Sequence, residues 1–218
     1  MTTTELQRWL LLPTAAISDA LDRHRIAGQV FGIRPLVPQV RFAGPAFTIR
    51  MLPVGVSGGT VGDYIDEVPP GHVVVIDNNA RMDASAWGGI LTITAQRRGV
   101  AGTVVDGICR DVAHAAAMAY PLFARAAFMR TGKDRIRVTD VQTTVSIGGV
   151  AVDPDDVVIG DADGVVVVPR LFAERIAEAA LDIEAREQQI VSAVRDGTRL
   201  DAARAKAGYH HLQRPQST

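Results

Sequence analysis

Between residues 72 and 128, short apolar runs alternate with segments in which apolar residues recur every three or four positions. Short runs of β-formers are typical of buried strands, and the longer spacing is typical of helices that cover them. The pattern predicts strands at 72–77, 103–106 and 122–128, and helices at 87–98 and 111–119. This alternation favours a β-α-β-α-β core with parallel strands and right-handed crossovers, with catalytic loops at the carboxyl ends of the strands.

After Gly132 the chain changes to short β-type runs that are separated by turns. Strands are predicted at 136–139, 143–152, 157–160 and 164–168. Gly148-Gly149 predicts a hairpin turn inside the second run, and the segment 161–164 predicts another turn between the last two runs. The alternation of strands and turns indicates an antiparallel layer on the α/β core.

The N-terminal part contains one predicted helix and a long β-rich segment. Ser18-Asp19 resembles the start of an N-capped helix, and Gly28 is expected to end that helix. Residues 41–51 are rich in β-formers and predict one or two strands. The glycine-containing segment 53–59 lacks the spacing of a nucleotide-binding loop, so we expect a flexible connection or a flap over a substrate.

The C-terminal part begins a long amphipathic helix at Pro169-Arg170. The apolar residues that share one face by three- and four-residue spacing are Phe172, Ile176, Ala179, Ile183, Ile190 and Val194. Glu187 lies on the same face. It occupies either an edge position whose carboxylate reaches water or an arginine, or a position that delivers the carboxylate into a cavity or across a subunit boundary. The pattern alone favours the edge position.

The composition is that of a globular protein with a substantial core, since 47% of the 218 residues are hydrophobic and 22% are charged. We expect a single domain over residues 1–218. The formal net charge of -1 indicates no overall attraction to nucleic acid or to an anionic membrane. No apolar run reaches transmembrane length, and Cys109 has no second cysteine to pair with, so we expect a cytoplasmic protein. Cys109 itself is interpreted as a small buried hydrophobe rather than a nucleophile.

The six residues from Asp106 to Asp111 join a predicted strand to a predicted helix. Arg110 and Asp111 therefore place a cation beside an anion at a strand-to-helix crossing, where α/β proteins bind anionic ligands. The alternative is purely structural, because aspartate is a favoured N-cap and the adjacent arginine can form a surface ion pair with it. Spacing alone does not choose between these interpretations. Asp106, which precedes Gly107, is interpreted as a turn residue that could also support the site residues from behind.

Five motifs occur in order along most of the chain: 87–91 (WGGIL), 98–102 (RGVAG), 106–111 (DGICRD), 120–125 (YPLFAR) and 160–169 (GDADGVVVVP). Together they resemble the 4-hydroxy-4-methyl-2-oxoglutarate aldolase family, which includes proteins like the regulator of ribonuclease E activity. The resemblance implies a swivelling β/β/α fold, similar to phosphohistidine domains, with a long C-terminal helix. It also implies a homotrimer or a dimer of trimers, with active sites between neighbouring subunits.

The activity implied by the resemblance is metal-dependent, class II cleavage of a small 4-hydroxy-2-oxo acid to pyruvate. The implied substrates include 4-hydroxy-4-methyl-2-oxoglutarate and 4-carboxy-4-hydroxy-2-oxoadipate, and decarboxylation of oxaloacetate passes through the same enolate. Arg110 would hold the pyruvyl part of the substrate, and Asp111 would lie beside Mg²⁺ or Mn²⁺. The backbone N–H groups of Ile90 and Leu91, at the start of a helix after Gly88-Gly89, would take the substrate carboxylate.

These residue types suit that chemistry. Cleavage of the C3–C4 bond leaves pyruvate enolate, and a dication beside a guanidinium stabilises the negative charge on its C2 oxygen. Mg²⁺ retains several waters, so one carboxylate ligand, Asp111, is chemically sensible. A base must also take the C4 hydroxyl proton, and our candidate is a polarised water ordered by Glu187 from a neighbouring subunit, with Glu184 as the alternative.

Some features depart from the family pattern or suggest another function. Gly89 stands where many aldolases of the family carry an acidic residue that orders metal-bound water, which predicts slow turnover or a different substrate. His72 and Asp155 replace common turn residues and are interpreted as structural drift. The alternative function is that of a non-catalytic relative that binds and inhibits ribonuclease E, but some such relatives lack the acidic residue that Asp111 provides here. The histidines form no zinc-binding pattern.

Overall fold

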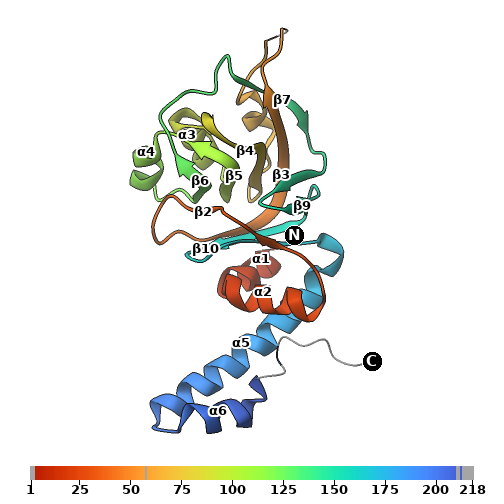
Figure 1. Ribbon diagram of the computed structural model, residues 1–218, viewed down its shortest axis with the longest axis vertical. Helices are drawn as coiled ribbons and strands as arrows, with labels where there is room; N and C mark the ends of the chain where they lie inside the picture. The colour runs from red at the N-terminus through yellow and green to blue at the C-terminus, as the bar shows by residue number, and fades with distance from the viewer. Residues whose placement is uncertain (1–2, 57, 210–211, 213–218) are drawn as a thin grey trace.

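The computed structural model describes residues 3–56, 58–209 and 212. Its central feature is a group of strands with helices in the crossovers (Figure 1). The strands are β3 (Phe42–Pro53), β4 (Val73–Trp87), β5 (Gly102–Cys109) and β6 (Leu122–Ala127), and the helices are α3 (Gly89–Arg97) and α4 (Val112–Ala117). Each neighbouring pair of these strands is parallel, so the predicted β-α-β-α-β core is confirmed.

Antiparallel strands continue the sheet on both sides of this core. The first residues of β3 pair with β10 (Val157–Asp161), and its last residues pair with β7 (Ile136–Val141). β10 pairs with β11 (Gly164–Val168), and β11 pairs with β1 (Gln29–Val30). At the other end of the sheet, β6 pairs with β2 (Arg34–Pro35). The predicted antiparallel strands are therefore present. Those at 136–139, 157–160 and 164–168 extend the parallel sheet, whereas the run at 143–152 forms a separate two-stranded sheet.

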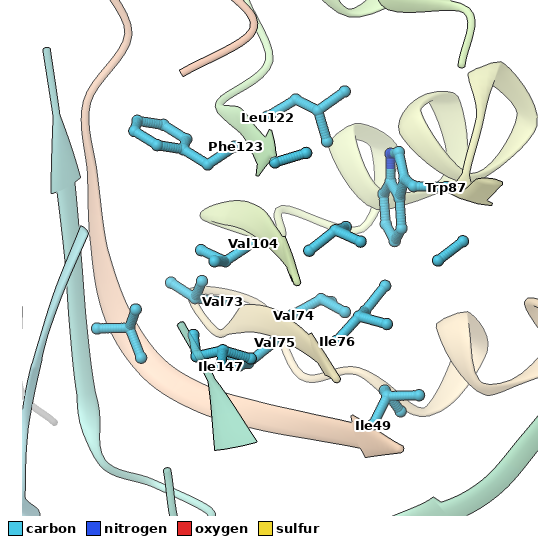
Figure 2. Close-up of a cluster of buried hydrophobic side chains, with 14 of the residues drawn as sticks. Ile49, Val73, Val74, Val75, Ile76, Trp87, Val104, Leu122, Phe123 and Ile147 are labelled. Carbon is cyan, nitrogen blue, oxygen red and sulfur yellow. The ribbon is translucent and has the colours of Figure 1, made fainter. Parts of the chain in front are cut away.

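The sheet curls around a hydrophobic core. Phe42 lies on β3 and Phe123 lies on β6, with β4 and β5 between them, yet their ring centroids are only 5.0 Å apart. Flat strands would hold these residues much farther apart. Figure 2 shows the buried side chains in this interior, including Val73 to Ile76, a run that is buried at every position. Burial on both faces is typical of a parallel strand, and the β-branched side chains fit its pleated surface.

A hairpin lies across β4 and closes one side of the core. It consists of β8 (Val145–Ile147) and β9 (Val150–Val152), as the sequence predicts. Gly148 and Gly149 have φ of +51° and +86°, the left-handed conformation that a type I′ turn requires. Asp106, buried in β5, accepts a hydrogen bond of 2.9 Å from the Gly148 N–H and pairs with Arg125. The interpretation of Asp106 as a turn residue is therefore wrong, because it is an anchor within a strand.

A second, helical layer over the antiparallel strands β10 and β11 consists of α1 (Thr3–Leu11), α2 (Thr14–Arg23) and the first half of α5 (Ala173–Arg195). A further helix, α6 (Leu200–Ala207), packs on α5. The long helix begins after a short turn, η2 (Arg170–Phe172), and its first half packs on α2. Its buried positions include Ile176, Ala179, Ile183 and Ile190, as predicted, while Phe172 and Val194 are exposed. Figure 1 shows α5 extending away from the sheet, with α6 beside its far end. The fold is mixed α/β with a long C-terminal helix, as predicted, and none of the described helices is long and apolar enough to cross a membrane.

The predicted start and end of the N-terminal helix are wrong. Ser18 lies inside α2, which begins at Thr14 and ends at Arg23, well before Gly28. Asp161, from the predicted turn between β10 and β11, accepts hydrogen bonds from the Thr14 N–H at 2.8 Å and from its hydroxyl at 2.6 Å. A carboxylate that is distant in the sequence therefore caps this helix, which local capping rules cannot detect.

The predicted end of the strand at residue 77 and the predicted start of the next helix at residue 87 are both wrong. β4 does not end at 77 but continues to Trp87, which was expected to be helical. Asn79 and Ala80 have φ of +51° and +52°, and the register between β4 and β5 shifts three times beyond Asp77. These irregularities and the polar residues between 77 and 83 hide the strand in the sequence. As a result, α3 begins at Gly89, directly after the end of the strand.

Candidate active site

The turn that follows β5 has an unusual backbone. Asp111 has φ of +58° and ψ of +34°, a left-handed conformation that aspartate tolerates better than most residues. It precedes α4, but its side chain makes no capping hydrogen bond there. Instead, its Oδ2 atom accepts a hydrogen bond of 2.9 Å from the backbone N–H of Gly89. The carboxylate therefore points toward the start of α3 and not into its own helix, which differs from the simple N-cap interpretation.

Arg110 is placed by the end of the neighbouring strand. Its backbone N–H donates a hydrogen bond of 3.0 Å to the carbonyl of Trp87, so the ends of β4 and β5 are joined. Its Nε atom lies 3.7 Å from Asp111 Oδ2, and the two side chains are 40% and 41% exposed. An ion pair this loose and exposed contributes little to stability, so both groups remain available for a ligand.

Gly88 and Gly89 allow close approach of α3 to this turn. A Cβ atom on Gly88 would lie 3.1 Å from Asp111 Oδ2 and 3.2 Å from Arg110 Nε, which is tighter than most real contacts. Gly88 is the N-cap of α3 and offers no side-chain cap. The N–H groups of Ile90 and Leu91 lie in the first turn, where no intrahelical acceptor exists. The sequence prediction that these N–H groups begin a helix after Gly88-Gly89 is confirmed.

These elements surround one cavity of about 480 Å³. Its walls include six of the seven expected residues: Gly88, Gly89, Ile90, Leu91, Arg110 and Asp111. A second wall comes from the segment around η1 (Asp63–Glu67) and a third from residues 131–133. The predicted location at the carboxyl ends of the parallel strands is therefore confirmed as the place where these residues meet.

The cavity also contains charged residues that the sequence reasoning missed. Lys133 brings a second cation, and Asp63 and Asp66 bring carboxylates to the η1 wall. Gly132 lets the chain approach β4 closely, since a Cβ there would lie 2.3 Å from the Ser85 carbonyl oxygen. No local motif identifies these residues, because they are far apart in the sequence and only the folded chain brings them to the same cavity.

Glu187 lies elsewhere in the folded chain. It is on α5, within the helical layer, and does not line the cavity that contains Arg110 and Asp111. Burial raises the pKa of Glu187, and the carboxylates of Asp19 and Glu184 raise it further. Within one chain, then, Glu187 is not brought to the other expected site residues, and the catalytic role predicted for it would require a neighbouring subunit.

Cys109 ends β5 one residue before Arg110. It is fully buried, and burial raises the pKa of its thiol well above the ordinary range. A thiol that is hard to ionise and closed off from solvent is a poor nucleophile. The interpretation of Cys109 as a buried hydrophobe is confirmed.

Asp111 fits a divalent cation that keeps most of its water. Among residues 3–56, 58–209 and 212, no three metal-ligating side chains gather into a closed site. Mg²⁺ and Mn²⁺ are often held by one or two carboxylates, with water and substrate oxygens as the other ligands. Asp111 offers such a carboxylate, half-exposed at the cavity wall and fixed in direction by the Gly89 N–H.

Residues 14–167 match the RraA-like family, described as Aldolase/RraA. The chain belongs to this family. The resemblance carried by the five sequence motifs is therefore confirmed. The matched residues of this RraA-like protein include the Gly88-Gly89 and Arg110-Asp111 segments.

Two sequence relatives illustrate the range of the family. Protein DlpA of Legionella pneumophila is 38% identical over 202 residues, which are 91% of this chain and 33% of that protein. The chain thus spans a third of the length of this relative. A protein of Halalkalibacterium halodurans, named "Putative 4-hydroxy-4-methyl-2-oxoglutarate aldolase", is 34% identical over 82% of this chain and 85% of its own length.

Solved structures of similar proteins have the same fold. An uncharacterized protein from Pseudomonas syringae superposes with a TM-score of 0.88 at 38% identity, covering 94% of this chain and 98% of that chain. Streptomyces coelicolor RraAS2, described as an unusual member of the RNase ES inhibitor RraA protein family, superposes with a TM-score of 0.79 at 26% identity. That superposition covers 86% of this chain and 96% of RraAS2.

Proposed function

We propose that this RraA-like protein is a divalent-metal-dependent lyase that cleaves a 4-hydroxy-2-oxo acid and releases pyruvate. The observation that carries the proposal is the meeting of Arg110, Asp111 and the first turn of α3 around one cavity. The proposed substrates are 4-hydroxy-4-methyl-2-oxoglutarate and 4-carboxy-4-hydroxy-2-oxoadipate, and the name of the H. halodurans relative supports the first. Oxaloacetate decarboxylation is proposed as a second activity, because it passes through the same enolate.

The pyruvyl end of the substrate would be held between α3 and Arg110. The N–H groups of Ile90 and Leu91 lack intrahelical acceptors, and a substrate carboxylate can accept both hydrogen bonds. The helix dipole adds a partial positive charge at the same place. Arg110, whose backbone is tied to Trp87 and whose Nε lies beside Gly88 at the start of α3, would then contact the 2-oxo oxygen.

Bond cleavage moves negative charge onto the C2 oxygen, and fixed positive groups near that oxygen lower the barrier. When bound beside Asp111, Mg²⁺ or Mn²⁺ supplies a Lewis acid for that oxygen. The Arg110 guanidinium supplies a permanent cation with directed N–H groups. Preorganised groups of this kind are each worth roughly 10²- to 10³-fold in rate.

The cavity offers a second cation for a second carboxylate. Lys133 lines it together with Thr131 and Gly132, and its side chain is exposed. Both proposed substrates carry a distal carboxylate, and an ammonium group there would orient it by charge. Lys133 therefore favours a dicarboxylic substrate over a neutral one of the same size.

Proton removal from the C4 hydroxyl requires a base, and Asp63 and Asp66 on the η1 wall are the carboxylates, besides Asp111, that one chain brings to the cavity. We assign the role of base to a water ordered by Glu187 from a neighbouring subunit, with Glu184 as the alternative. This assignment requires a homotrimer or a dimer of trimers. Large apolar side chains near the cavity, including Ile90, Ile93 and Met129, are exposed, which supports the burial of this surface in an assembly.

The experiment that tests the proposal is a pyruvate-release assay with the purified full chain. The 4-hydroxy-2-oxo acids and oxaloacetate are each supplied with Mg²⁺ or Mn²⁺, and a chelator is added in parallel reactions. Pyruvate release that the chelator abolishes is expected. The lyase proposal fails if the metal-loaded protein releases no pyruvate from any of these substrates. If that protein instead binds ribonuclease E and inhibits RNA cleavage, its function is inhibition, as the description of RraAS2 indicates for that relative.

A further inference from the structure

The absence of a side chain at Gly89 leaves a space that two metal-binding groups border. The point where a Cβ atom of Gly89 would lie is 3.4 Å from Asp111 Oδ2 and 3.4 Å from His114 Nδ1. His114 is exposed on α4, so its ring can adjust toward a ligand. The proposed cation ligand and an imidazole nitrogen therefore lie within contact distance of the same point.

The local backbone explains this arrangement. His114 follows Asp111 by three residues, and its N–H donates a hydrogen bond of 2.9 Å to the Asp111 carbonyl oxygen, which starts α4. The Gly89 N–H holds Asp111 Oδ2 near the Cβ position of Gly89, so a side chain at residue 89 would contact both the carboxylate and the imidazole.

We infer that His114 supplies a nitrogen donor to the cation that Asp111 holds, either directly or through one water. The inference rests on the proposed function, which places a divalent cation at Asp111. A carboxylate with an imidazole suits Mn²⁺, Co²⁺ or Zn²⁺, whereas Mg²⁺ prefers oxygen ligands alone. The site therefore selects a first-row transition ion over Mg²⁺, and water and the substrate fill its other positions.

The direct test is electron spin-echo spectroscopy of Mn²⁺ bound to the full chain, because an imidazole nitrogen near Mn²⁺ modulates the echo. We expect nitrogen modulation in the wild type and none in His114→Ala or His114→Gln. Removing a ligand or its supporting group typically lowers metal affinity by about 10- to 100-fold, so titration calorimetry should show that loss for Mn²⁺. The loss for Mg²⁺ should be smaller.

Matched variants separate this inference from the proposed function. His24→Ala removes a histidine that follows α2, in the other helical layer, and should leave both signals unchanged. Asp111→Asn should abolish Mn²⁺ binding. If Asp111→Asn abolishes binding but the wild type shows no nitrogen modulation and His114→Ala binds Mn²⁺ normally, the His114 inference fails and the Asp111 site stands. If the wild type binds no Mn²⁺ at all, the metal dependence of the proposed function fails with it.

A reciprocal variant tests the role of the space itself. Gly89→Asp in the His114→Ala background places a carboxylate where the imidazole donor was lost. We expect this double variant to recover tight binding with a preference shifted toward Mg²⁺. Circular dichroism and thermal unfolding check that each variant is folded. A double variant that is folded but binds both ions as weakly as His114→Ala would contradict the proposed placement of the ion in this space.

Discussion

Asp111 Oδ2 and the backbone N–H of Gly89 are joined by a hydrogen bond of 2.9 Å that crosses from the turn after β5 to the start of α3. This bond directs the carboxylate into the cavity instead of toward its own helix. It also fixes the distance between the proposed cation site and the free N–H groups of α3. The two halves of the proposed pyruvate site therefore depend on each other.

Replacement of Asp111 by Asn should abolish metal-dependent turnover and preserve the fold. The amide keeps the size of the side chain but removes the negative charge that holds a dication. We expect turnover to fall at least 10²-fold, as measured by pyruvate release at saturating Mg²⁺. Asp155→Asn, at an exposed aspartate beside His72 and outside the cavity, serves as a control and should keep wild-type activity.

Replacement of Arg110 by Ala should lower kcat/KM by roughly 10²- to 10³-fold, because a fixed cation is lost from the C2 oxygen. Arg110→Lys should recover part of the activity, since it keeps the charge but not the planar pair of donors. The melting temperature should hardly change, because the side chain is half-exposed and its ion pair with Asp111 is loose. Equal activity in Arg110→Ala and the wild type would contradict the assigned role.

Gly88→Ala should raise KM for the 2-oxo acid more than Gly89→Ala, whose methyl group would instead border the proposed ion and weaken metal binding. A methyl group on Gly88 would crowd Asp111 Oδ2 and Arg110 Nε at 3.1 and 3.2 Å, whereas the nearest atoms to a methyl group on Gly89 lie at 3.4 Å. We expect Gly88→Ala to raise KM for the 2-oxo acid by roughly an order of magnitude through displaced charged groups. Steady-state kinetics of both variants at saturating metal measure KM for the 2-oxo acid. A larger rise in that KM for Gly89→Ala than for Gly88→Ala would oppose this explanation.

Loss of the Asp106 carboxylate should destabilise the fold. Asp106 is buried, pairs with Arg125 and accepts a hydrogen bond from the hairpin N–H of Gly148. Asp106→Ala would leave the guanidinium partly buried without its partner, which typically costs about 3–5 kcal/mol. Chemical denaturation should detect this loss, and Asp163→Ala at an exposed turn is the matched control. A stability change below about 1 kcal/mol for Asp106→Ala would contradict the role of this pair as an anchor.

Glu187 should make stability depend on pH in a defined direction. Burial and two nearby carboxylates raise the pKa of Glu187 in the folded chain. A group with a raised folded pKa contributes its full stability below the unfolded pKa and loses it as pH rises through the folded pKa. Glu187→Gln should therefore be more stable relative to the wild type at pH 7 than at pH 4. The change in the free energy of unfolding should be modest, because water still screens this side chain. If the variant and the wild type differ by the same free energy of unfolding at pH 7 and pH 4, the predicted pH dependence is wrong.

Mixed oligomers test whether Glu187 acts across subunits. Arg110→Ala and Glu187→Gln chains should each have low activity alone. If the site is shared between neighbours, oligomers assembled from both variants contain some sites with wild-type Arg110 and Glu187, and activity is partly recovered. Refolded mixtures are compared with each variant at the same total concentration. No recovery in a mixture that has formed hetero-oligomers would contradict the cross-subunit assignment.

The sequence predicts the parallel core because β4 and β5 contain continuous β-branched runs such as Val73 to Ile76, which have no other stable location. It also predicts the location of Arg110 and Asp111, because strand-to-helix crossings in a parallel sheet meet at one edge. It does not predict that Asp111 has φ of +58° or that its carboxylate accepts a hydrogen bond from Gly89, which is 22 residues away in the sequence.

The roles of Asp161 and Lys133 could not be predicted from the sequence, and the physical reason is the same for both. Asp161 caps α2, and Lys133 enters the cavity, through contacts between segments that are distant along the chain. Local propensity contains no information about such contacts. The role of Glu187 and the extent of the single domain over residues 1–218 stay predictions, since the first requires a neighbouring subunit.

The central claim is that Arg110 and a dication held by Asp111 stabilise pyruvate enolate. Exchange of the methyl protons of pyruvate tests this claim directly, because it does not depend on the distal group of the substrate. Pyruvate is incubated with the protein in D₂O, and proton NMR follows its methyl signal. The signal should decay with Mg²⁺ or Mn²⁺ present, and should persist with a chelator or with Arg110→Ala. A methyl signal that decays no faster with the metal-loaded wild type than in buffer alone would contradict the account.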